Sequence, residues 1–539
     1  MPVQSFSFDT KILLTVRELR YPVARYSLLS LKFMFEGVFH LPKNRKESSS
    51  LCVIGYLFFS LGLMITPCFL MGLHNGEPVD ATGIPMVIGL VIGILLILRY
   101  KTAEFMRPVN ALTVLGQLWA ASFLFGMLPW MIQGYSPFDA LFESVSGLTT
   151  TGASIIPDVG VLPRSLLLWR QMTNWIGGIM IILLVMFVLP MVGFGNRNTI
   201  SNEMSGSSGS FKISVKVKDA AIQFMVVYIL LSVLMVVLLM LCGVNLYDSL
   251  CIMLPTLPTG GFGCLVSYND YNTANLVKII IIVFMFLGAT NFYLHFRALF
   301  FKQTDVYRKN TEFMVMLGLV VAVSVAVFLI VNPTSTASAL DTFIDCAFIV
   351  TSSSSTTGLT SVDFTQWPSL AMVLVYIMCI IGGSSGSTAG GIKVFRIVVL
   401  FQYIKTMFQR VMNPNNVRNA FRGKETPVSE SEIRSVLVVI FMVLVTLVTF
   451  SFVLMVFGID PNEAVVTVIS IFTSFGPSIG SCSVAYDCMP DFIKVCLALV
   501  MWLGRLEVVT ALAILSPSTW KEQIRDWRYH RRLDAESRS

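Results

Sequence analysis

The sequence is poor in charge. Only 13% of its 539 residues are Asp, Glu, Lys or Arg, whereas 55% are hydrophobic. Soluble domains carry about 25% charged residues, so this composition argues against a soluble protein. Several apolar runs also reach the roughly 20 residues that cross a bilayer as a helix, among them "VVYILLSVLMVVLLMLCGV" at 226–244. We therefore expect an all-α membrane protein that crosses the lipid bilayer many times.

Residue types that build catalytic and metal sites are scarce as well. The four His lie far apart, and no HExxH or GxSxG motif occurs. The ten Cys include no CxxC pair, which argues against a thiolate metal site or a disulfide framework. These absences predict neither an enzyme nor an organic cofactor. The formal net charge of +7 fits basic residues retained on cytoplasmic loops, so no nucleic-acid partner is expected.

Lys and Arg are missing from every second connection between the apolar segments. The connections without them are 74–83, 135–163, 245–273, 333–367 and 458–489. By the positive-inside bias, both termini are cytoplasmic. Residues 1–50 lack the features of a cleavable signal and are expected to form a cytoplasmic extension. About ten spans follow, at 51–73, 84–99, 110–134, 164–190, 220–243, 274–300, 311–332, 368–402, 433–457 and 490–516.

Four of the connections without basic residues share one pattern. They read "FDALFESVSGLTTTGAS", "YDSLCIMLPTLPTGGFG", "IDCAFIVTSSSSTTGLT" and "NEAVVTVISIFTSFGPS". Each has an acid, then a moderately apolar stretch too short to span a bilayer, then a glycine among small polar residues. The acid-to-glycine separations are 13, 12, 13 and 13 residues. The acids and their glycines are Asp139 with Gly152, Asp248 with Gly260, Asp345 with Gly358, and Glu463 with Gly476.

This pattern predicts one helix–pore loop–helix unit that is repeated four times around one central pore, after two extra N-terminal helices. Irregular backbone at membrane depth is stable only where protein buries it or where it lines a watery cavity. Four such loops can meet at one axis, and their carbonyl oxygens can replace the water shell of a cation. Taken singly, each loop can also be a helix-packing patch rich in small residues, and each acid a solvated loop residue or a helix cap. If they act together, the acids raise the cation concentration at the mouth.

The expected division of the chain follows these repeats. It comprises an N-terminal cytoplasmic extension at 1–50, the extra helix pair at 51–109, pore repeat 1 at 110–198, pore repeat 2 at 199–302, pore repeat 3 at 303–424, pore repeat 4 at 425–518 and a basic cytoplasmic tail at 519–539.

The loops and the helices that follow them resemble the TrkH family within the Trk/Ktr/HKT superfamily of potassium transporters. The similar segments are "FESVSGLTTTGAS", "WRQMTNWIGGI", "NFYLHFRAL", "GGSSGSTAGGIKVFRI" and "GRLEVVTALAILSPSTW". The resemblance extends over roughly residues 51–525. It implies K⁺ as the transported ion, residence in the bacterial inner membrane, a homodimer, and a TrkA-like partner, which is a cytosolic nucleotide-binding regulatory ring protein.

The resemblance also implies the residues of a potassium filter. In relatives that prefer sodium the first filter glycine is often serine, so Gly152 favours potassium. Pro258 stands where the family usually has a small hydroxyl residue, and the family usually has Asn near Thr473 and Ser474. The implied filter residues are Thr150, Thr151 and Gly152; Pro258, Thr259 and Gly260; Thr356, Thr357 and Gly358; and Ser474, Phe475 and Gly476.

The eighth predicted span is interrupted by "GGSSGSTAGG" at 382–391, which has five glycines and four hydroxyl residues and is poor helix material. The spacing of a phosphate-binding loop is absent, because Ile392 separates Gly391 from Lys393. A kinked, closely packed helix is one interpretation. The resemblance instead implies an intramembrane gating loop that obstructs the pore below the filter. Its expected gate residues are Gly382, Gly383, Gly386, Gly390 and Gly391.

Arg505 is a charged residue inside the last predicted span, where charge is costly and usually functional. It can pair with another helix or reach the interface. The resemblance instead implies that it faces the pore below the filter and opposes the residence of cations. The predicted function is potassium uptake through a carbonyl-lined filter, gated by the intramembrane loop and this arginine. Proton- or sodium-coupled potassium symport through the same pore is the alternative. Symport built on inverted repeats is not favoured, because the four units share one orientation.

Overall fold

The computed structural model describes residues 46–101, 108–192, 213–263, 274–412, 430–480, 485–521 and 525. Most of the predicted extension at 1–50 and of the predicted tail at 519–539 lies outside these residues. Within them the chain is helical, apart from two strands of two residues each, β1 (Lys46–Glu47) and β2 (Tyr100–Lys101), which pair in parallel. The expected all-α class is confirmed.

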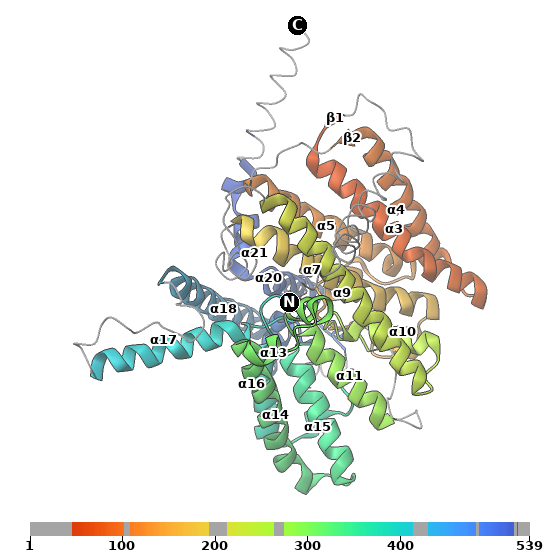
Figure 1. The fold of residues 1–539 in the computed structure, drawn as a ribbon. Coiled ribbons are helices and arrows are strands. Elements are labelled where there is room, and N and C mark those ends of the chain that lie inside the picture. Colours follow the sequence, from red (N-terminus) through yellow and green to blue (C-terminus); the bar gives the residue numbers. More distant parts are fainter. Residues whose placement is uncertain are drawn as a thin grey trace, which may run out of the picture.

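The helices form an N-terminal pair and four similar sets around a common centre (Figure 1). Each set has a long first helix, a short helix and a second helix, and in three sets the second helix is broken. The pair is α3 (Ser49–Asn75) and α4 (Asp80–Arg99). The sets are α5 (Pro108–Ile132), α6 (Pro137–Leu148) and α7 (Arg164–Val192); α9 (Ile213–Leu241), α10 (Leu246–Thr256), α11 (Ala274–Gly288) and α12 (Phe292–Phe301); α14 (Thr311–Val331), α15 (Ala339–Ser354), α16 (Ser369–Ile381) and α17 (Val394–Met412); and α18 (Glu430–Val456), α19 (Pro461–Thr473), α20 (Asp491–Arg505) and α21 (Val508–Leu515). The connections add α13 (Asp305–Lys309) and the 3₁₀ turns η1 (Val159–Val161), η3 (Asn332–Thr334) and η4 (Phe364–Gln366).

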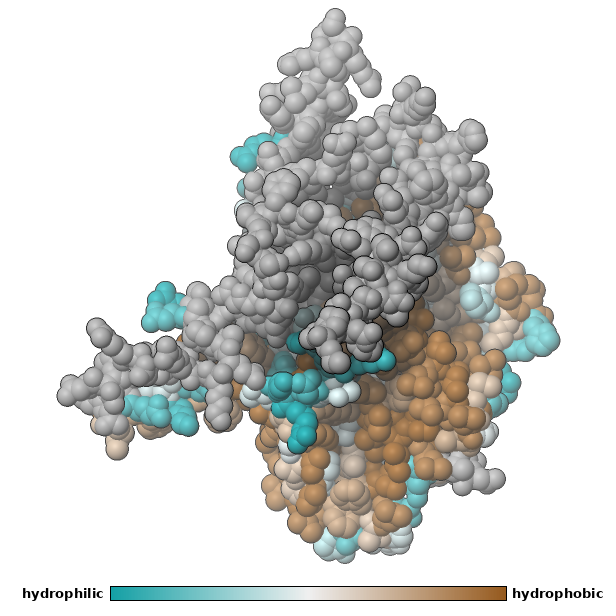
Figure 2. All heavy atoms as spheres, in the orientation of Figure 1, coloured by the Kyte–Doolittle hydropathy of each residue, from teal (hydrophilic) through white to brown (hydrophobic). Residues whose placement is uncertain are grey.

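The long helices have the length and composition of membrane spans. Among the described residues, seven helices are long and apolar enough to cross a bilayer, and the bent pairs α11–α12 and α20–α21 raise this to nine. The remaining predicted span, 368–402, comprises α16 and α17, and α16 alone is too short. Apolar side chains such as Val321 and Leu329 of α14 are exposed. Figure 2 shows this apolar surface where α11, α14 and α15 lie, as expected of helices that face lipid.

The four short helices begin with the same kind of cap. In each, a polar side chain just before the helix accepts a hydrogen bond from a backbone N–H in the first turn: Ser136 for α6, Asn245 for α10, Ser338 for α15 and Asp460 for α19. Such caps satisfy N–H groups that have no partner within the helix. The helices contain 12, 11, 16 and 13 residues, which is too few to cross a bilayer. Their lengths agree with the prediction of stretches too short to span a bilayer.

Two of the predicted spans are sharply bent. The chain turns by 101° between α11 and α12, and by 116° between α20 and α21. At the first break, His295 Nε2 binds the Leu287 carbonyl at 2.9 Å and the Ser384 N–H binds the Ala289 carbonyl. These bonds replace helical ones, and the Asn291 side chain caps α12 through the Tyr293 N–H. The spans predicted at 274–300 and 490–516 each contain one of these bends, which the sequence did not indicate because apolar periodicity does not reveal such substitute partners.

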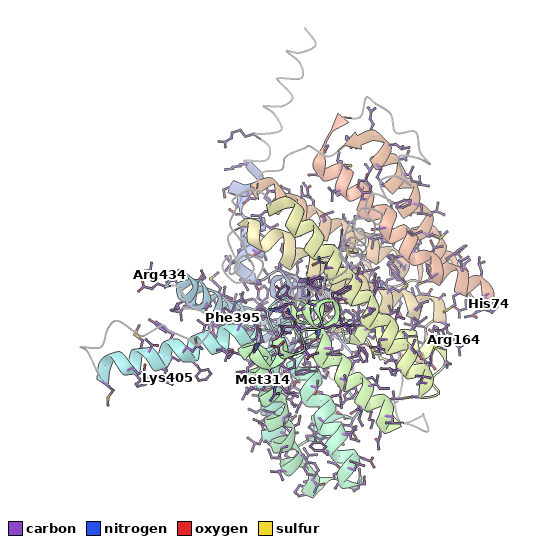
Figure 3. All side chains as sticks on the ribbon, viewed as in Figure 1. His74, Arg164, Met314, Phe395, Lys405 and Arg434 are labelled. Carbon is purple, nitrogen blue, oxygen red and sulfur yellow. The ribbon has the colours of Figure 1, made fainter. Side chains whose placement is uncertain are left out.

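The extra pair α3 and α4 packs closely through glycine. A side chain at Gly93 of α4 would come within 2.5 Å of the Phe59 nitrogen of α3, and one at Gly89 would come within 2.9 Å of the Gly62 Cα. Small residues permit this backbone approach in membrane helices. On another side of the molecule, α17 extends from the body beside α18 (Figure 1). Figure 3 shows Lys405 and Arg434 on these two helices, far from His74 and Arg164 at the opposite margin.

Candidate functional site

The segments after the four short helices contact one another in a closed cycle. Each has one glycine with positive φ, and a Cβ there would collide with a carbonyl oxygen of the next segment. The pairs are Gly152 with the Gly260 oxygen, Gly261 with the Thr357 oxygen, Gly358 with the Phe475 oxygen, and Gly476 with the Thr151 oxygen. The order runs from loop 1 through loops 2, 3 and 4 back to loop 1. We call these four loop segments and their carbonyls the ring.

Every ring segment begins with the same backbone turn. The residue after the short helix's last turn is left-handed, with φ of 52° at Thr150, 55° at Thr259, 53° at Thr356 and 62° at Ser474. The next N–H then binds the carbonyl five residues back, at 2.8–2.9 Å in all four loops. This is the Schellman ending of a helix, in which glycine usually takes the left-handed position. Three of the four residues here are Thr, for which this conformation is a genuine outlier. Such strain persists where surrounding structure enforces it, commonly at functional sites.

The second loop has a different register from the one predicted. Its left-handed residue is Thr259, its positive-φ glycine is Gly261, and its Gly260 nitrogen makes the five-residue hydrogen bond to Pro255. The residues equivalent to Thr150, Thr151 and Gly152 are therefore Thr259, Gly260 and Gly261. The assignment of Pro258, Thr259 and Gly260 to these three positions was wrong by one residue. With Gly261 as the glycine, the separation from Asp248 becomes 13 residues, as in the other loops.

This correction removes the apparent departure at proline. Pro258 precedes the left-handed residue, as Thr149, Ser355 and Thr473 do in the other loops. The left-handed position itself carries a hydroxyl in all four: Thr150, Thr259, Thr356 and Ser474. All four are buried. Among the described residues, the Thr150 and Ser474 hydroxyls have no hydrogen-bond partner. Buried polar groups without partners are unusual, and these two fit a cation or a water at the ring.

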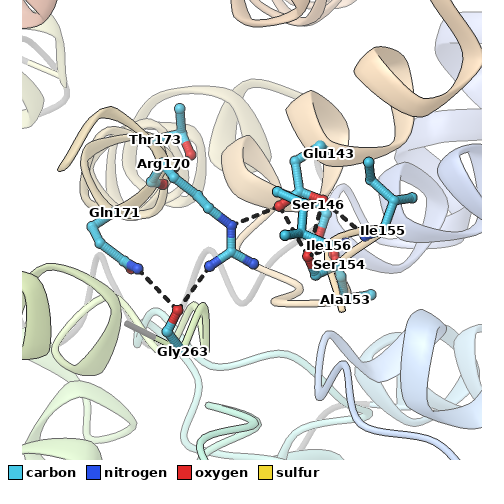
Figure 4. A network of polar contacts seen from close by, with 10 residues as sticks. All are labelled: Glu143, Ser146, Ala153, Ser154, Ile155, Ile156, Arg170, Gln171, Thr173 and Gly263. Atoms are coloured by element: carbon cyan, nitrogen blue, oxygen red, sulfur yellow. Dashed lines mark hydrogen bonds and ion pairs between the residues drawn. The ribbon is translucent and has the colours of Figure 1, made fainter. Parts of the chain in front are cut away.

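A buried ion pair fastens the first two loops. Arg170 Nε of α7 lies 2.7 Å from Glu143 Oε1 of α6, and the arginine also donates to the Gly263 carbonyl after loop 2 at 2.9 Å (Figure 4). The other Glu143 oxygen accepts from the Ile155 N–H at 3.0 Å. The guanidinium lies 3.7 Å from the centre of the Phe262 ring. Glu143 and Arg170 were missed from sequence, although an acid and an arginine within apolar helices are themselves a signal.

Two further ion pairs connect the short helices to neighbouring repeats. Lys494 of α20 binds Asp139 of α6 at 2.6 Å, and Lys278 of α11 binds Asp345 of α15 at 2.8 Å. They join repeat 4 to repeat 1 and repeat 2 to repeat 3. Two of the four predicted mouth acids are thus neutralised by lysine, which weakens the expectation that all four attract cations. Nearby, hydrogen bonds from Asn275 and Ser338 lower the pKa of the Asp341 carboxyl.

The interruption between α16 and α17 is a closed loop. Its neck is held by three backbone hydrogen bonds, from the Ile392, Lys393 and Val394 nitrogens to the Ile380, Ile381 and Gly383 carbonyls. Gly382 and Gly391 both have positive φ, and a Cβ on Gly391 would come within 2.7 Å of the Gly382 Cα. The interpretation as a merely kinked helix is therefore wrong, because the chain leaves the helix and returns to the same place. We call residues 382–393 the intramembrane loop.

The intramembrane loop contacts the ring directly. The Gly390 N–H binds the Thr356 hydroxyl at 2.6 Å, and the Thr388 hydroxyl binds the Gly288 carbonyl at 3.0 Å and the Leu257 carbonyl at 3.3 Å. A Cβ on Gly390 would collide with the Thr473 carbonyl. Gly383 lies against Ala289, and Gly386 lies against Asn291. The five predicted gate glycines therefore all lie at close approaches, either at the neck or against the surrounding segments.

Arg505 ends α20 and is 6% exposed. Its Nη2 donates to the Thr388 carbonyl on the intramembrane loop. Two residues later, after the bend, Glu507 pairs with Arg396 of α17 at 2.7 Å. Of the two charged residues at the α20–α21 break, Arg505 thus holds the intramembrane loop and Glu507 holds the helix that follows it. The Arg505 Nε has no partner among the described residues.

The comparisons with known proteins agree with this architecture. A family model described as "TrkH: Cation transport protein" matches residues 111–523. The "Trk system potassium uptake protein TrkH" of Halomonas elongata is 30% identical over 486 residues, covering 87% of this chain and 98% of the relative. The protein of the same name from Escherichia coli (strain K12) is 31% identical over 429 residues, covering 78% and 86%.

A solved structure has the same fold. The crystal structure of the potassium transporter TrkH from Vibrio parahaemolyticus matches with a TM-score of 0.78 and 26% identity. The match covers 88% of this chain and 99% of that one. The four-unit arrangement around one centre is therefore shared with a solved transporter.

The register of loop 2 gives a testable difference between neighbouring glycines. Gly261→Ala places a Cβ against the Thr357 carbonyl and imposes a left-handed conformation that costs about 1–2 kcal/mol. We expect this variant to lose at least about tenfold in cation uptake. Gly263→Ala is the matched control, because a Cβ there meets nothing within 4 Å. Rubidium uptake into cells at equal expression is the measurement. Equal uptake by the two variants would contradict the register.

The Glu143–Arg170 pair gives a prediction about stability. Glu143→Gln leaves a buried guanidinium without its counter-charge, which typically costs about 3–5 kcal/mol. We expect a clearly lower thermal midpoint for the purified protein in detergent. Asp158→Asn serves as the control, because Asp158 is an exposed acid in the connection after loop 1 and surface substitutions change stability by about 0.5 kcal/mol or less. A Glu143→Gln midpoint equal to that of the control would show that the pair contributes nothing.

Proposed function

The chain belongs to the TrkH family of cation transport proteins, and we propose that it takes up potassium across the bacterial inner membrane through the ring. The observation that carries this proposal is the cycle of four equivalent carbonyls, those of Thr151, Gly260, Thr357 and Phe475, at the contacts between loops. Carbonyl oxygens held at fixed spacing replace the hydration shell of a cation. No organic cofactor takes part.

The proposed filter comprises the left-handed residue, the following residue and the glycine of each loop. The helices α6, α10, α15 and α19 end at these segments, and the C-terminal end of a helix carries partial negative charge that favours a cation. The hydroxyls of Thr150 and Ser474, which lack protein partners among the described residues, are available to an ion or its water. In the corrected register the proposed filter residues are Thr150, Thr151 and Gly152; Thr259, Gly260 and Gly261; Thr356, Thr357 and Gly358; and Ser474, Phe475 and Gly476.

The proposed gate is the intramembrane loop together with Arg505. The loop lies against the ring through Thr356, Leu257 and Thr473, so an ion that leaves the ring meets it. Arg505 holds the loop at the Thr388 carbonyl and adds a positive charge that opposes cation residence. Conduction therefore requires the intramembrane loop and Arg505 to move away from the path of the ion below the ring.

The relatives are named as components of a Trk system. We propose that this chain likewise works as a homodimer with a TrkA-like nucleotide-binding ring on the cytoplasmic side, and that both termini are cytoplasmic. The basic connections, which alternate with connections free of Lys and Arg, support this orientation. They also supply positive charge on the side where a cytosolic partner would bind.

The deciding experiment is the reversal potential of the purified protein in planar bilayers or liposomes, with potassium, sodium and proton gradients varied separately. A potential that follows the potassium gradient alone supports a potassium conduit. A shift with the pH or sodium gradient at fixed potassium would instead support coupled symport. A reversal potential that follows the chloride gradient, or that responds to none of the ion gradients, would refute the proposed function.

Gly152→Ser tests the potassium preference of the ring. A Cβ at this position would lie 2.6 Å from the Gly260 carbonyl, and φ is +78°. The substitution therefore displaces one ring carbonyl, and we expect the potassium-to-sodium uptake ratio to fall by about tenfold, which corresponds to about 1.4 kcal/mol. Competitive uptake of the two ions in cells measures this ratio. An unchanged ratio in a well-expressed variant would be against the role of Gly152.

Arg505→Ala tests the arginine as part of the gate. The variant removes both the positive charge and the hydrogen bond to the Thr388 carbonyl. Potassium uptake at matched expression is expected to rise by at least about tenfold, because a hydrogen bond to a charged group is worth about 1.5–3 kcal/mol. Arg434→Ala, on an exposed helical turn, is the control with the same charge change. Equal or reduced uptake by Arg505→Ala would contradict the proposal.

A further inference from the structure

Glu312 is a carboxylate that the proposed filter and gate do not use. It is the second residue of α14, in the first helical turn, and its side chain is partly buried. Its Oε1 accepts the Ser385 N–H at 2.6 Å and the Phe395 N–H at 3.2 Å. Ser385 lies within the intramembrane loop, and Phe395 is the second residue of α17. One oxygen atom therefore joins the loop to the helix that follows it.

Burial of the Glu312 carboxyl opposes its charge, whereas the groups that it binds favour the charged form. Glu312 lies in the first turn of its own helix and also binds a first-turn N–H of α17. Helix N-terminal ends carry partial positive charge, and an anion near one is stabilised. Hydrogen bonds to an ionised acceptor are also about twice as strong as neutral ones.

The other hydrogen bonds that hold the intramembrane loop lie mostly at different residues of the loop or join it to other helices. Thr388 and Gly390 contact the ring and Arg505, and the neck is closed by backbone bonds on residues 392–394. Lys393 donates to the Ala389 carbonyl and so stays within the loop. On the Ser385 side, the bonds between Ser384 and Ala289 and between Gly386 and Phe292 attach the loop to the α11–α12 break. Glu312 attaches this part of the loop and the start of α17 to α14 by two bonds from backbone N–H groups, beside a longer contact of 3.5 Å from the Ser384 hydroxyl to the Met316 sulfur.

We propose that Glu312 is a positioning residue that latches the intramembrane loop in its obstructing position. The inference rests on the proposed function, since it assigns a gating role to a residue outside the ion path. A displacement of the first turn of α14 then pulls directly on Ser385. The short helix α13 and the turn at Asn310 precede this turn, so movement of the connection between repeats 2 and 3 reaches the loop through Glu312.

The first experiment reads the loop without reference to transport. Amide hydrogen exchange of the full chain in detergent is compared for wild type, Glu312→Ala, Glu312→Gln and Asp305→Ala. Asp305 is the matched control, an exposed acid on α13 that pairs with Lys309. Glu312→Ala is expected to raise exchange at 382–395 by about tenfold, the factor that corresponds to one hydrogen bond to a charged group. Glu312→Gln keeps an oxygen acceptor without the charge and is expected to be intermediate. Asp305→Ala is expected to match wild type.

The second experiment measures potassium efflux from liposomes for the same variants. If Glu312 latches the loop, potassium efflux through Glu312→Ala is expected to be about tenfold faster than through wild type. Efflux through Asp305→Ala is expected to equal that of wild type. Exchange at 382–395 that stays at the wild-type level overturns the proposal, and so does faster exchange throughout the chain, which would mean general unfolding. The gating role is overturned if Glu312→Ala shows faster local exchange but the same efflux as wild type, provided that wild-type efflux is measurable. If neither wild type nor Arg505→Ala shows potassium efflux, the proposed function fails. If exchange at 382–395 is still faster in Glu312→Ala, the contact between Glu312 and the loop stands.

Discussion

The structure depends on four close backbone contacts in which no Cβ fits. At Gly152, Gly261, Gly358 and Gly476 a carbonyl of the neighbouring loop occupies the space where a side chain would begin. Neighbouring segments can therefore approach one another only through glycine, and the cycle closes only if all four do. Hydrogen bonds within each loop help to hold these segments at that distance. The short helices end in the same turn, and Ser146 and Ser470 donate to the carbonyls of Ala153 and Pro477 at 2.5 Å, so the outgoing chain in loops 1 and 4 is held in the same way.

Most of the architecture could be predicted from sequence, because it follows from composition and from repetition at fixed spacing. The register of loop 2 could not, since "TGGFG" offers two adjacent glycines and only the backbone angles distinguish them. The separation of 12 residues, against 13 in the other loops, was the available signal. The bends after Gly288 and Arg505 were hidden because the flanking sequence stays apolar. Glu312 was hidden for another reason: an acid in a first helical turn is an ordinary cap, and its second role depends on a loop more than 70 residues away.

The same limit applies to the charged network. Glu143, Arg170, Lys278 and Lys494 are single charges in apolar or outer segments, and no spacing rule pairs residues that lie 27, 67 or 355 positions apart. The structure shows that they join separate repeats or fix a loop to its neighbour. In a bundle surrounded by lipid there is little hydrophobic drive between helices. Ion pairs and hydrogen bonds therefore carry much of the specificity with which the four sets meet.

The two lysine–aspartate ion pairs also make the four boundaries between repeats unequal. Lys278 and Lys494 stand ten residues before Gly288 and Gly504, glycines that contact the short-helix carbonyls of Leu257 and Phe472. The corresponding positions in repeats 1 and 3 are Leu167 and Met372. Two opposite boundaries of the ring are thus fastened by lysine, and the two between them by other contacts, such as Arg170 with Gly263 and Cys379 with Thr473. The contacts around the ring therefore follow a two-fold rather than a four-fold pattern, and each repeat meets a lysine–aspartate pair on one side and a contact of another kind on the other.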